Sequence, residues 1–248
     1  MGSLRTITVG LALATCVTAT APAGASDYQP WGGAYIGASL GYSWSDVDGV
    51  YPNHIPSDFH NSSPKGGLVG AHFGIQHQIG QFLIGVEAAV SGHGPFDTWG
   101  RSTGPSSDCL GNNTAADPRS CQHRQDFIFT VGPRLGWAPS NQWLLYATGG
   151  YASTNLDSRT INTATGLQIT ETHGSHDGWF IGGGVEYALT KNWIFGVEYQ
   201  HLDFGRELHV VSTGNALDNR YLELTQDIVR ARLSFKLGRP EERHEALK

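Results

Sequence analysis

The chain has 248 residues, enough for one large domain, with 33 glycines and a single methionine. Its 16 Lys and Arg against 22 Asp and Glu give a formal net charge of −6, so no basic surface for a nucleic-acid partner is expected.

The N-terminus resembles an export signal. Arg5 is followed by the apolar run Ile7–Ala14 and then by the small-residue site Ala23-Gly24-Ala25. We expect residues 1–25 to be cleaved, which leaves 15 basic against 22 acidic residues, a charge of −7. One alternative is a permanent membrane helix, but the apolar run is shorter than the ~18 residues that such a helix requires. The other is lipidation at Cys16, but Thr15 before the cysteine fits a lipoprotein cleavage site poorly.

Segments with an apolar residue at every second position follow the signal. In the first, Ala34, Ile36, Ala38, Leu40, Tyr42 and Trp44 alternate with Gly, Ser and Tyr. Eight such segments predict strands: Ala34–Trp44, Val69–Gln76, Phe82–Ser91, Phe127–Trp137, Trp143–Ala152, Trp179–Leu189, Trp193–Gln200 and Val229–Leu237. The fifth alternates too weakly for its faces to be assigned, and Pro133 in the fourth predicts a bulge.

The connections alternate between short and long. Turns at 80–81, 139–142 and 190–192 separate long polar stretches at about 46–65, 92–124, 154–176 and 205–224. This arrangement predicts an all-β protein, an eight-stranded antiparallel transmembrane β-barrel with short periplasmic turns and four long extracellular loops. The barrel domain would occupy residues 26–238, and residues 239–248 would form a charged tail.

The placement of charge distinguishes this barrel from a secreted lipocalin-like ligand binder, which would carry its charges outside. Here the charged positions share a parity with glycine and serine and should face a tight polar interior. They are Glu87, Arg134, Glu186, Glu198, Arg230, Arg232 and Lys236. We expect the acids and bases to pair there, since an isolated buried charge is costly; the alternative is solvation by water in the lumen.

Aromatic residues gather near the strand ends, where they would form girdles at the lipid headgroups. They are Tyr42, Trp44, Trp137, Trp143, Trp179, Tyr187 and Trp193. The lipid bilayer is therefore the expected partner.

Cys109 and Cys121 are the two cysteines that survive processing, and both lie in one polar segment of an exported chain. An oxidising compartment favours a disulfide between them over free thiols.

Histidines are frequent in the predicted loops, and imidazoles from several loops could meet on a haem iron or a metal ion. The candidates are His173, His176, His54 and His60, with His93, His123 and His209 also in loops. The simpler interpretation is that polar loops contain histidines, so no cofactor is expected.

An enzyme and a diffusion pore are two further possibilities. His201-Leu-Asp203 is the nearest approach to a catalytic pair, but no serine is marked as its nucleophile, so no catalytic residues are assigned and an enzyme is not expected. For a pore, eight strands leave little open lumen.

The residues from Trp31 to Gly238 resemble the porin-like, outer-membrane immunogenic proteins of Gram-negative bacteria, relatives of the OmpA transmembrane barrel. The resemblance rests on Trp31-Gly-Gly-Ala-Tyr-Ile-Gly, Pro133-Arg-Leu-Gly-Trp, Leu145-Tyr-Ala-Thr-Gly-Gly-Tyr, Gly182-Gly-Gly-Val-Glu-Tyr, and Gly196-Val-Glu-Tyr ahead of Leu202-Asp.

This resemblance implies a surface-exposed envelope protein that is antigenic at its loops and has structural or adhesive duties. For some members of this family, haem binding or modest solute passage is proposed as a further function. The implied partners are the outer-membrane bilayer, the barrel assembly machinery during insertion, and host or environmental surface ligands, and we expect a monomer. Members commonly end on an aromatic residue, whereas here a charged tail follows Leu237-Gly238.

Overall fold

The computed structural model describes residues 31–51, 58–93, 100–101, 119–162, 164–209 and 220–237. Regular structure in these residues consists of strands β1 (Gly33–Tyr51), β2 (Asp58–Ser62), β3 (Lys65–Ile79), β4 (Phe82–His93), β5 (Gly100–Arg101), β6 (Arg119–Trp137), β7 (Trp143–Asn162), β8 (Gln168–Ala188), β9 (Trp193–His209) and β10 (Arg220–Leu237). No helix in these ranges is long and apolar enough to cross a membrane.

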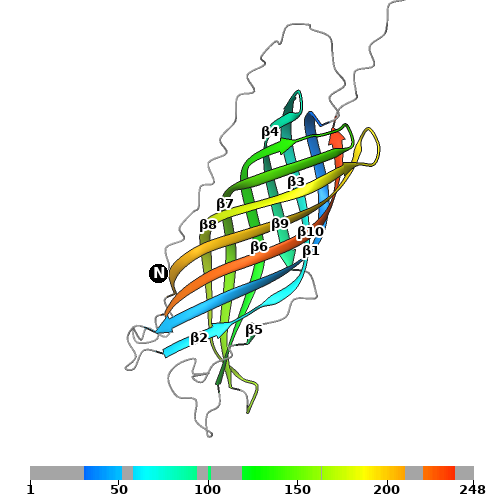
Figure 1. Cartoon of the computed structure of the whole chain (residues 1–248). Helices are drawn as coiled ribbons and strands as arrows, with labels where there is room; N and C mark the ends of the chain where they lie inside the picture. Colours follow the sequence, from blue (N-terminus) through cyan, green and yellow to red (C-terminus); the bar gives the residue numbers. More distant parts are fainter. Residues whose placement is uncertain are drawn as a thin grey trace, which may run out of the picture.

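Eight of the strands form a closed antiparallel barrel (Figure 1). Their order is β1, β3, β4, β6, β7, β8, β9 and β10, and β10 pairs back to β1 from Ala34↔Leu237 to Val50↔Tyr221. The short strands β2 and β5 pair with the outer parts of β1 and β6. The predicted eight-stranded barrel is confirmed.

The three short turns lie at one end of the barrel, at the top of Figure 1. They join β3 to β4 through Gly80-Gln81, β6 to β7 through residues 138–142, and β8 to β9 through residues 189–192. Because Ala34 pairs with Leu237, β1 starts and β10 ends at this same end. The three predicted turns are confirmed, and both ends of the barrel chain lie at the short-turn end.

The long connections are shorter than predicted, because the strands continue into them. The predicted loop 154–176 is mostly strand, since β7 runs to Asn162 and β8 starts at Gln168. Loop 46–65 contains the end of β1, β2 and the start of β3. Beyond the apolar band the outer face is polar, as at Asp46 and Asp48, and apolar residues such as Val47 and Leu156 face inward. The outward apolar alternation therefore ends there, although the backbone ladder continues.

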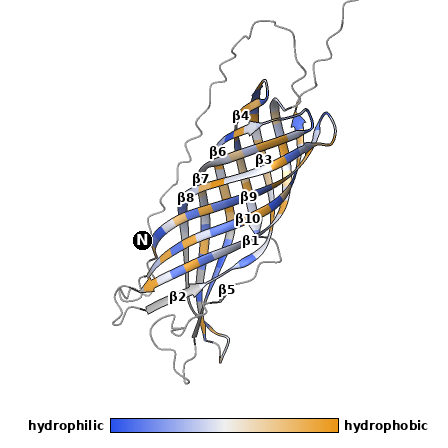
Figure 2. Ribbon diagram, in the orientation of Figure 1, coloured by the Kyte–Doolittle hydropathy of each residue, from blue (hydrophilic) through white to orange (hydrophobic). Residues whose placement is uncertain are grey.

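The two faces of the wall have the predicted polarity, which Figure 2 shows as alternating orange and blue along the strands. On β1, Ile36, Leu40 and Trp44 are exposed on the outside, whereas Ser39 and Ser43 are buried inside. On β7, whose faces the sequence leaves unassigned, Trp143 and Leu145 face out and Leu144, Tyr146 and Thr148 face in. This outward apolar face excludes the lipocalin-like alternative.

Aromatic side chains on the outer face cluster at the short-turn end. The Trp143 ring lies 4.9 Å from that of Tyr187, and the Trp193 ring lies 5.0 Å from that of Phe235, centroid to centroid. At the opposite end Trp44, Trp179 and Tyr199 are also exposed on the outside. These residues form the two girdles that bound the apolar band.

The interior is not polar throughout, in contrast to the expectation from the sequence pattern. Buried apolar side chains fill the short-turn end: Trp31, Leu83, Ala138, Leu144 and Ile194. A larger apolar cluster fills the long-loop end: Val47, Leu68, Ile128, Ala152, Leu156, Phe180, Leu202, Phe204, Leu222, Leu224 and Ile228. The inward positions near both ends carry large apolar residues because they pack on one another across the narrow lumen.

The bulge predicted at Pro133 lies elsewhere. The β6–β7 register is the same on both sides of Pro133, from Val131↔Tyr151 to Arg134↔Thr148, and shifts between Gln125 and Ile128. Pro133 faces outward, and its carbonyl accepts a hydrogen bond from the Thr148 hydroxyl at 3.0 Å.

Candidate functional site

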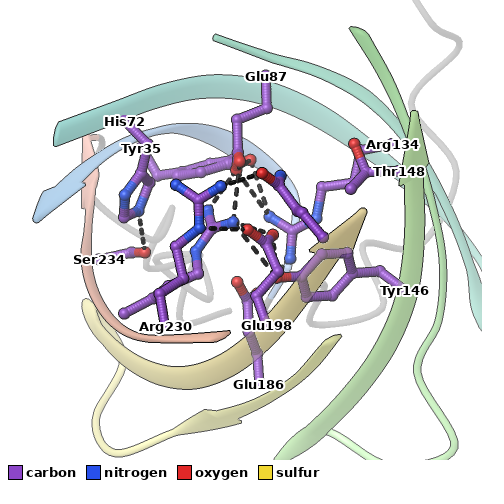
Figure 3. Close-up of polar contacts among 12 residues, drawn as sticks. Tyr35, His72, Glu87, Arg134, Tyr146, Thr148, Glu186, Glu198, Arg230 and Ser234 are labelled. Atoms are coloured by element: carbon purple, nitrogen blue, oxygen red, sulfur yellow. Dashed lines mark hydrogen bonds and ion pairs between the residues drawn. The ribbon is translucent and has the colours of Figure 1, made fainter. Parts of the chain in front are cut away.

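Six charged side chains meet in the middle of the barrel and form what we call the ion-pair layer: Glu87 on β4, Arg134 on β6, Glu186 on β8, Glu198 on β9, and Arg230 and Arg232 on β10. All six are buried, and Figure 3 shows Glu87, Arg134, Glu186, Glu198 and Arg230 pointing toward one another from around the wall. Three carboxylates face three guanidinium groups, so the layer is balanced in charge.

Arg134 connects opposite parts of this layer. Its guanidinium lies 2.6 Å from a carboxylate oxygen of Glu186 and 3.4 Å from one of Glu87. The same group stands over the ring of Tyr146, with 3.7 Å from Cζ to the ring centroid. Two ion pairs and a cation–π contact compensate the desolvation of this charge.

The β10 arginines bind Glu87 and Glu198. Arg232 pairs with Glu87 at 2.5 Å and also with Glu198. Arg230 pairs through Nε with Glu198 at 2.9 Å and donates to the Ser91 hydroxyl at 3.3 Å and to Gln200. Each carboxylate therefore has at least one arginine partner.

Two tyrosines complete the layer, and neither is singled out by the sequence pattern. The Tyr35 hydroxyl donates to Glu87 at 2.6 Å, and the Tyr146 hydroxyl donates to Glu198 at 2.6 Å. Tyr35 has the glycine parity of β1, which is a usable signal. Tyr146 lies on β7, whose weak alternation conceals its inward direction.

Glycines in the wall make room for these rings. A Cβ on Gly74 would lie 2.3 Å from the Tyr35 hydroxyl oxygen, and one on Gly184 would lie 2.6 Å from that of Tyr146. Side chains at these positions would displace the tyrosines from their carboxylates.

Lys236 is half-buried on β10, four residues from Arg232 toward the short-turn end. This spacing places its backbone about 13 Å further along the strand. Its participation in the charge network stays a prediction.

The histidine candidates lie in strands rather than in loops. His60 belongs to β2, His93 to β4, His123 to β6, and His173 and His176 to β8, whereas His54 lies outside the described residues. Since β8 runs continuously through His173 and His176, the loop expected to bring both imidazoles to one ion is not there. Within the described ranges, no group of three or more His, Cys, Asp and Glu could hold a metal ion.

His176 is fully buried in the outer part of the barrel, beyond Trp179. Burial lowers the pKa of its imidazole from 6.5 to about 4, and the nearby Asp177 carboxylate opposes this shift. The side chain is therefore neutral near pH 7.

His201 does not pair with Asp203, the partner suggested by the sequence. Its Nδ1 lies 2.8 Å from Asp227 on β10, and the Tyr199 hydroxyl donates to the same carboxylate oxygen at 2.7 Å. Asp203 instead accepts the Gly205 amide at 2.8 Å. The His201 and Asp227 side chains are partly exposed, on the outward parity of their strands beside Trp179.

The predicted disulfide joins Cys121 on β6 to Cys109, which lies outside the described residues. The bond stays a prediction, as do the boundaries at residues 1–25 and 239–248, which are also outside the described ranges.

Comparisons with known proteins agree with this architecture. The family model for the outer membrane protein beta-barrel domain matches residues 9–229. The chain is 25% identical over 221 residues to the 31 kDa outer-membrane immunogenic protein of Brucella melitensis, with 85% of each covered. It is 26% identical over 197 residues to outer membrane protein A of Serratia marcescens, covering 79% of this chain and 49% of that protein.

The structure resembles the outer membrane protein OprG from Pseudomonas aeruginosa, with a TM-score of 0.53, 11% identity, and 84% and 97% of the two chains covered. That likeness supports the fold alone. The chain belongs to the outer membrane protein beta-barrel domain family and is a protein of the bacterial outer membrane.

Proposed function

We propose that the barrel is a closed, non-enzymatic membrane anchor whose strands and loops beyond the outer girdle present contact surfaces to molecules outside the cell. Outer-membrane barrels place their short turns in the periplasm, so the long-loop end of this barrel is extracellular. The closed lumen is the observation that carries the proposal.

The lumen is filled at three successive levels: the periplasmic apolar cluster, the ion-pair layer and the extracellular apolar cluster. Leu144, Arg232 and Leu202, one from each level, are at most 2% exposed to solvent. A permeating ion would have to separate the paired charges and cross two apolar layers. An eight-stranded barrel has only enough interior for its own side chains, so an anchor fits better than a pore.

The extracellular strands provide the surface for contact. The β7–β8 hairpin ends in a turn in which the Asn162 side chain accepts the amides of Ala164 and Thr165 at 2.9 and 3.0 Å. Leu167 follows this turn and is 68% exposed. A large apolar side chain at the tip of a projecting polar hairpin is a suitable anchor for a binding partner.

Insertion by the barrel assembly machinery and a monomeric state are parts of the same proposal. Each of the eight barrel strands has two neighbouring strands, with β10 paired to β1. No second copy is needed to cover an edge in the lipid.

Two measurements test the function. Purified protein in planar bilayers should give no unitary conductance, and a steady conductance would overturn the closed anchor. Antibodies raised against the folded barrel should bind intact cells, and Leu167→Asp should reduce that binding.

The matched control is Leu189→Asp, because Leu189 is an equally apolar, 54% exposed residue in a turn at the opposite end. Its replacement should leave antibody binding to intact cells unchanged. Equal effects of the two variants, or no effect of either, would contradict the proposed display surface.

A further inference from the structure

Trp31 lies just before β1 and turns into the mouth of the barrel. Its side chain is 0% exposed and packs in the periplasmic apolar cluster with Leu83 of β4, Leu144 of β7 and Ile194 of β9. One indole thus contacts the apolar cluster formed by strand ends from different sides of the wall, in the position of a stopper.

Two glutamines of β3 hold the backbone of Trp31 in this position. The Trp31 amide donates to Gln78 Oε1 at 3.1 Å, and Gln76 Nε2 donates to the Trp31 carbonyl at 2.6 Å. Gln78 is itself fixed to the β3–β4 turn, where its Nε2 donates to the Gly80 carbonyl at 2.8 Å. Side-chain hydrogen bonds, and not backbone ladder bonds, therefore hold the backbone of Trp31. These bonds can break without unpairing a strand.

Trp31 is joined to the barrel wall through Gly32 and through Gly33, the first residue of β1. Gly33 has a φ of 111°, and a Cβ at this position would meet nothing within 4 Å. Glycine is therefore required here by the backbone conformation rather than by close packing, because residues with a Cβ rarely adopt this φ. Such a link is suited to act as a hinge.

The closed position leaves one polar group unsatisfied. The Trp31 Nε1–H is buried and has no hydrogen-bond partner among the described residues. A buried indole normally finds an acceptor. Moving the side chain into water would give this group a hydrogen bond, which offsets part of the free energy needed to expose the indole.

We propose that Trp31 is a hinged stopper of the periplasmic mouth, latched by Gln76 and Gln78 and rotating on Gly32-Gly33. When it opens, water enters the periplasmic third of the lumen as far as the ion-pair layer, while the rest of the barrel stays closed. The proposal rests on the closed lumen proposed above. It adds that one of the three levels opens independently of the other two.

The test compares two buried alanines, Ala138 in the periplasmic cluster and Ala152 in the extracellular cluster. Each is replaced by cysteine in a Cys109→Ala, Cys121→Ala background, and its reaction with a small water-soluble methanethiosulfonate is timed on folded protein. Heat-dependent gel mobility verifies that each variant remains folded.

The Ala138→Cys site should react at least about tenfold faster than Ala152→Cys, because local opening requires less free energy than global unfolding. Adding Gln78→Ala should accelerate the Ala138→Cys site by about tenfold more and leave Ala152→Cys unchanged. Gln142→Ala, which alters an exposed glutamine in a turn at the same end, should change neither rate.

Equal rates at the two sites, or acceleration of both by Gln78→Ala, would overturn the stopper. The bilayer recording separates this outcome from failure of the anchor. Trp31→Ala should still give no conductance, because the ion-pair layer remains; a conducting Trp31→Ala variant would show that the other two levels do not close the lumen.

Discussion

The guanidinium of Arg134 on β6 lies 2.6 Å from the carboxylate of Glu186 on β8, so this ion pair crosses β7, the strand between them. The Tyr146 ring of β7 packs against the guanidinium. These side-chain contacts join the neighbouring strands β6, β7 and β8 through the lumen, in addition to their backbone hydrogen bonds.

Arg134→Met should destabilise the barrel by about 3–5 kcal/mol, because Glu186 would keep a buried charge without its nearest partner. The measurement is the temperature at which half of the protein loses its folded gel mobility, or the urea midpoint in detergent. The double variant Arg134→Met, Glu186→Gln should recover a large part of the stability, since it removes both charges.

Lys191→Ala is the control for this pair, because Lys191 is an exposed charge in the β8–β9 turn. Its effect should stay within about 0.5 kcal/mol. If Arg134→Met were as mild as Lys191→Ala, the ion-pair layer would not stabilise the barrel.

Gly132→Ala should destabilise the barrel by about 1–3 kcal/mol through overpacking. A Cβ on Gly132 would lie 2.0 Å from the Gly149 carbonyl oxygen, a backbone atom that cannot move aside independently. Gly67→Ala is a matched control, because the nearest atom to its Cβ would be 4.0 Å away. Equal urea midpoints for the two variants would contradict the close approach of β6 and β7.

The fold is predictable from sequence because lipid imposes a rule on every strand. In the hydrocarbon core, only a closed sheet satisfies all its backbone hydrogen bonds, and only an apolar outer face can contact the lipid chains. The alternation of Ile36 and Leu40 with Ser39 and Gly41 follows from that rule. Outside the membrane the rule no longer applies, so the sequence around Thr160 and Thr170 predicts a loop where the structure has strands.

The candidate site is partly predictable for the same reason. Charged residues such as Arg134 and Glu198 can be placed inside from their parity with glycine. Their partners depend on which strands face each other across the lumen, and parity carries no such information. The roles of Tyr146 and Trp31 are not predictable, because the sequence does not distinguish buried aromatic residues from those of the girdles.

Val197→Arg should cost about 2–4 kcal/mol, the usual penalty for a charge on the lipid face near the bilayer midplane. Val197 is exposed on the outside of β9, between Trp193 at one girdle and Tyr199 at the other. Leu189→Arg places the same charge on an exposed apolar residue of the periplasmic turn and should have little effect. Refolding into lipid vesicles followed by urea unfolding measures both, and equal penalties would place the apolar band elsewhere on the barrel.

Acid should weaken the extracellular part of the barrel through His176. Its pKa in the folded protein is about 4, below the ordinary 6.5, so between these values the unfolded chain binds a proton that the native imidazole does not. Stability contributed by this residue is therefore complete above pH 6.5 and falls as the pH is lowered toward 4, by at most about 3 kcal/mol. His176→Gln should reduce the decline in urea resistance between pH 7.5 and pH 4.5. An unchanged pH slope in this variant would show that burial of the imidazole has no energetic consequence.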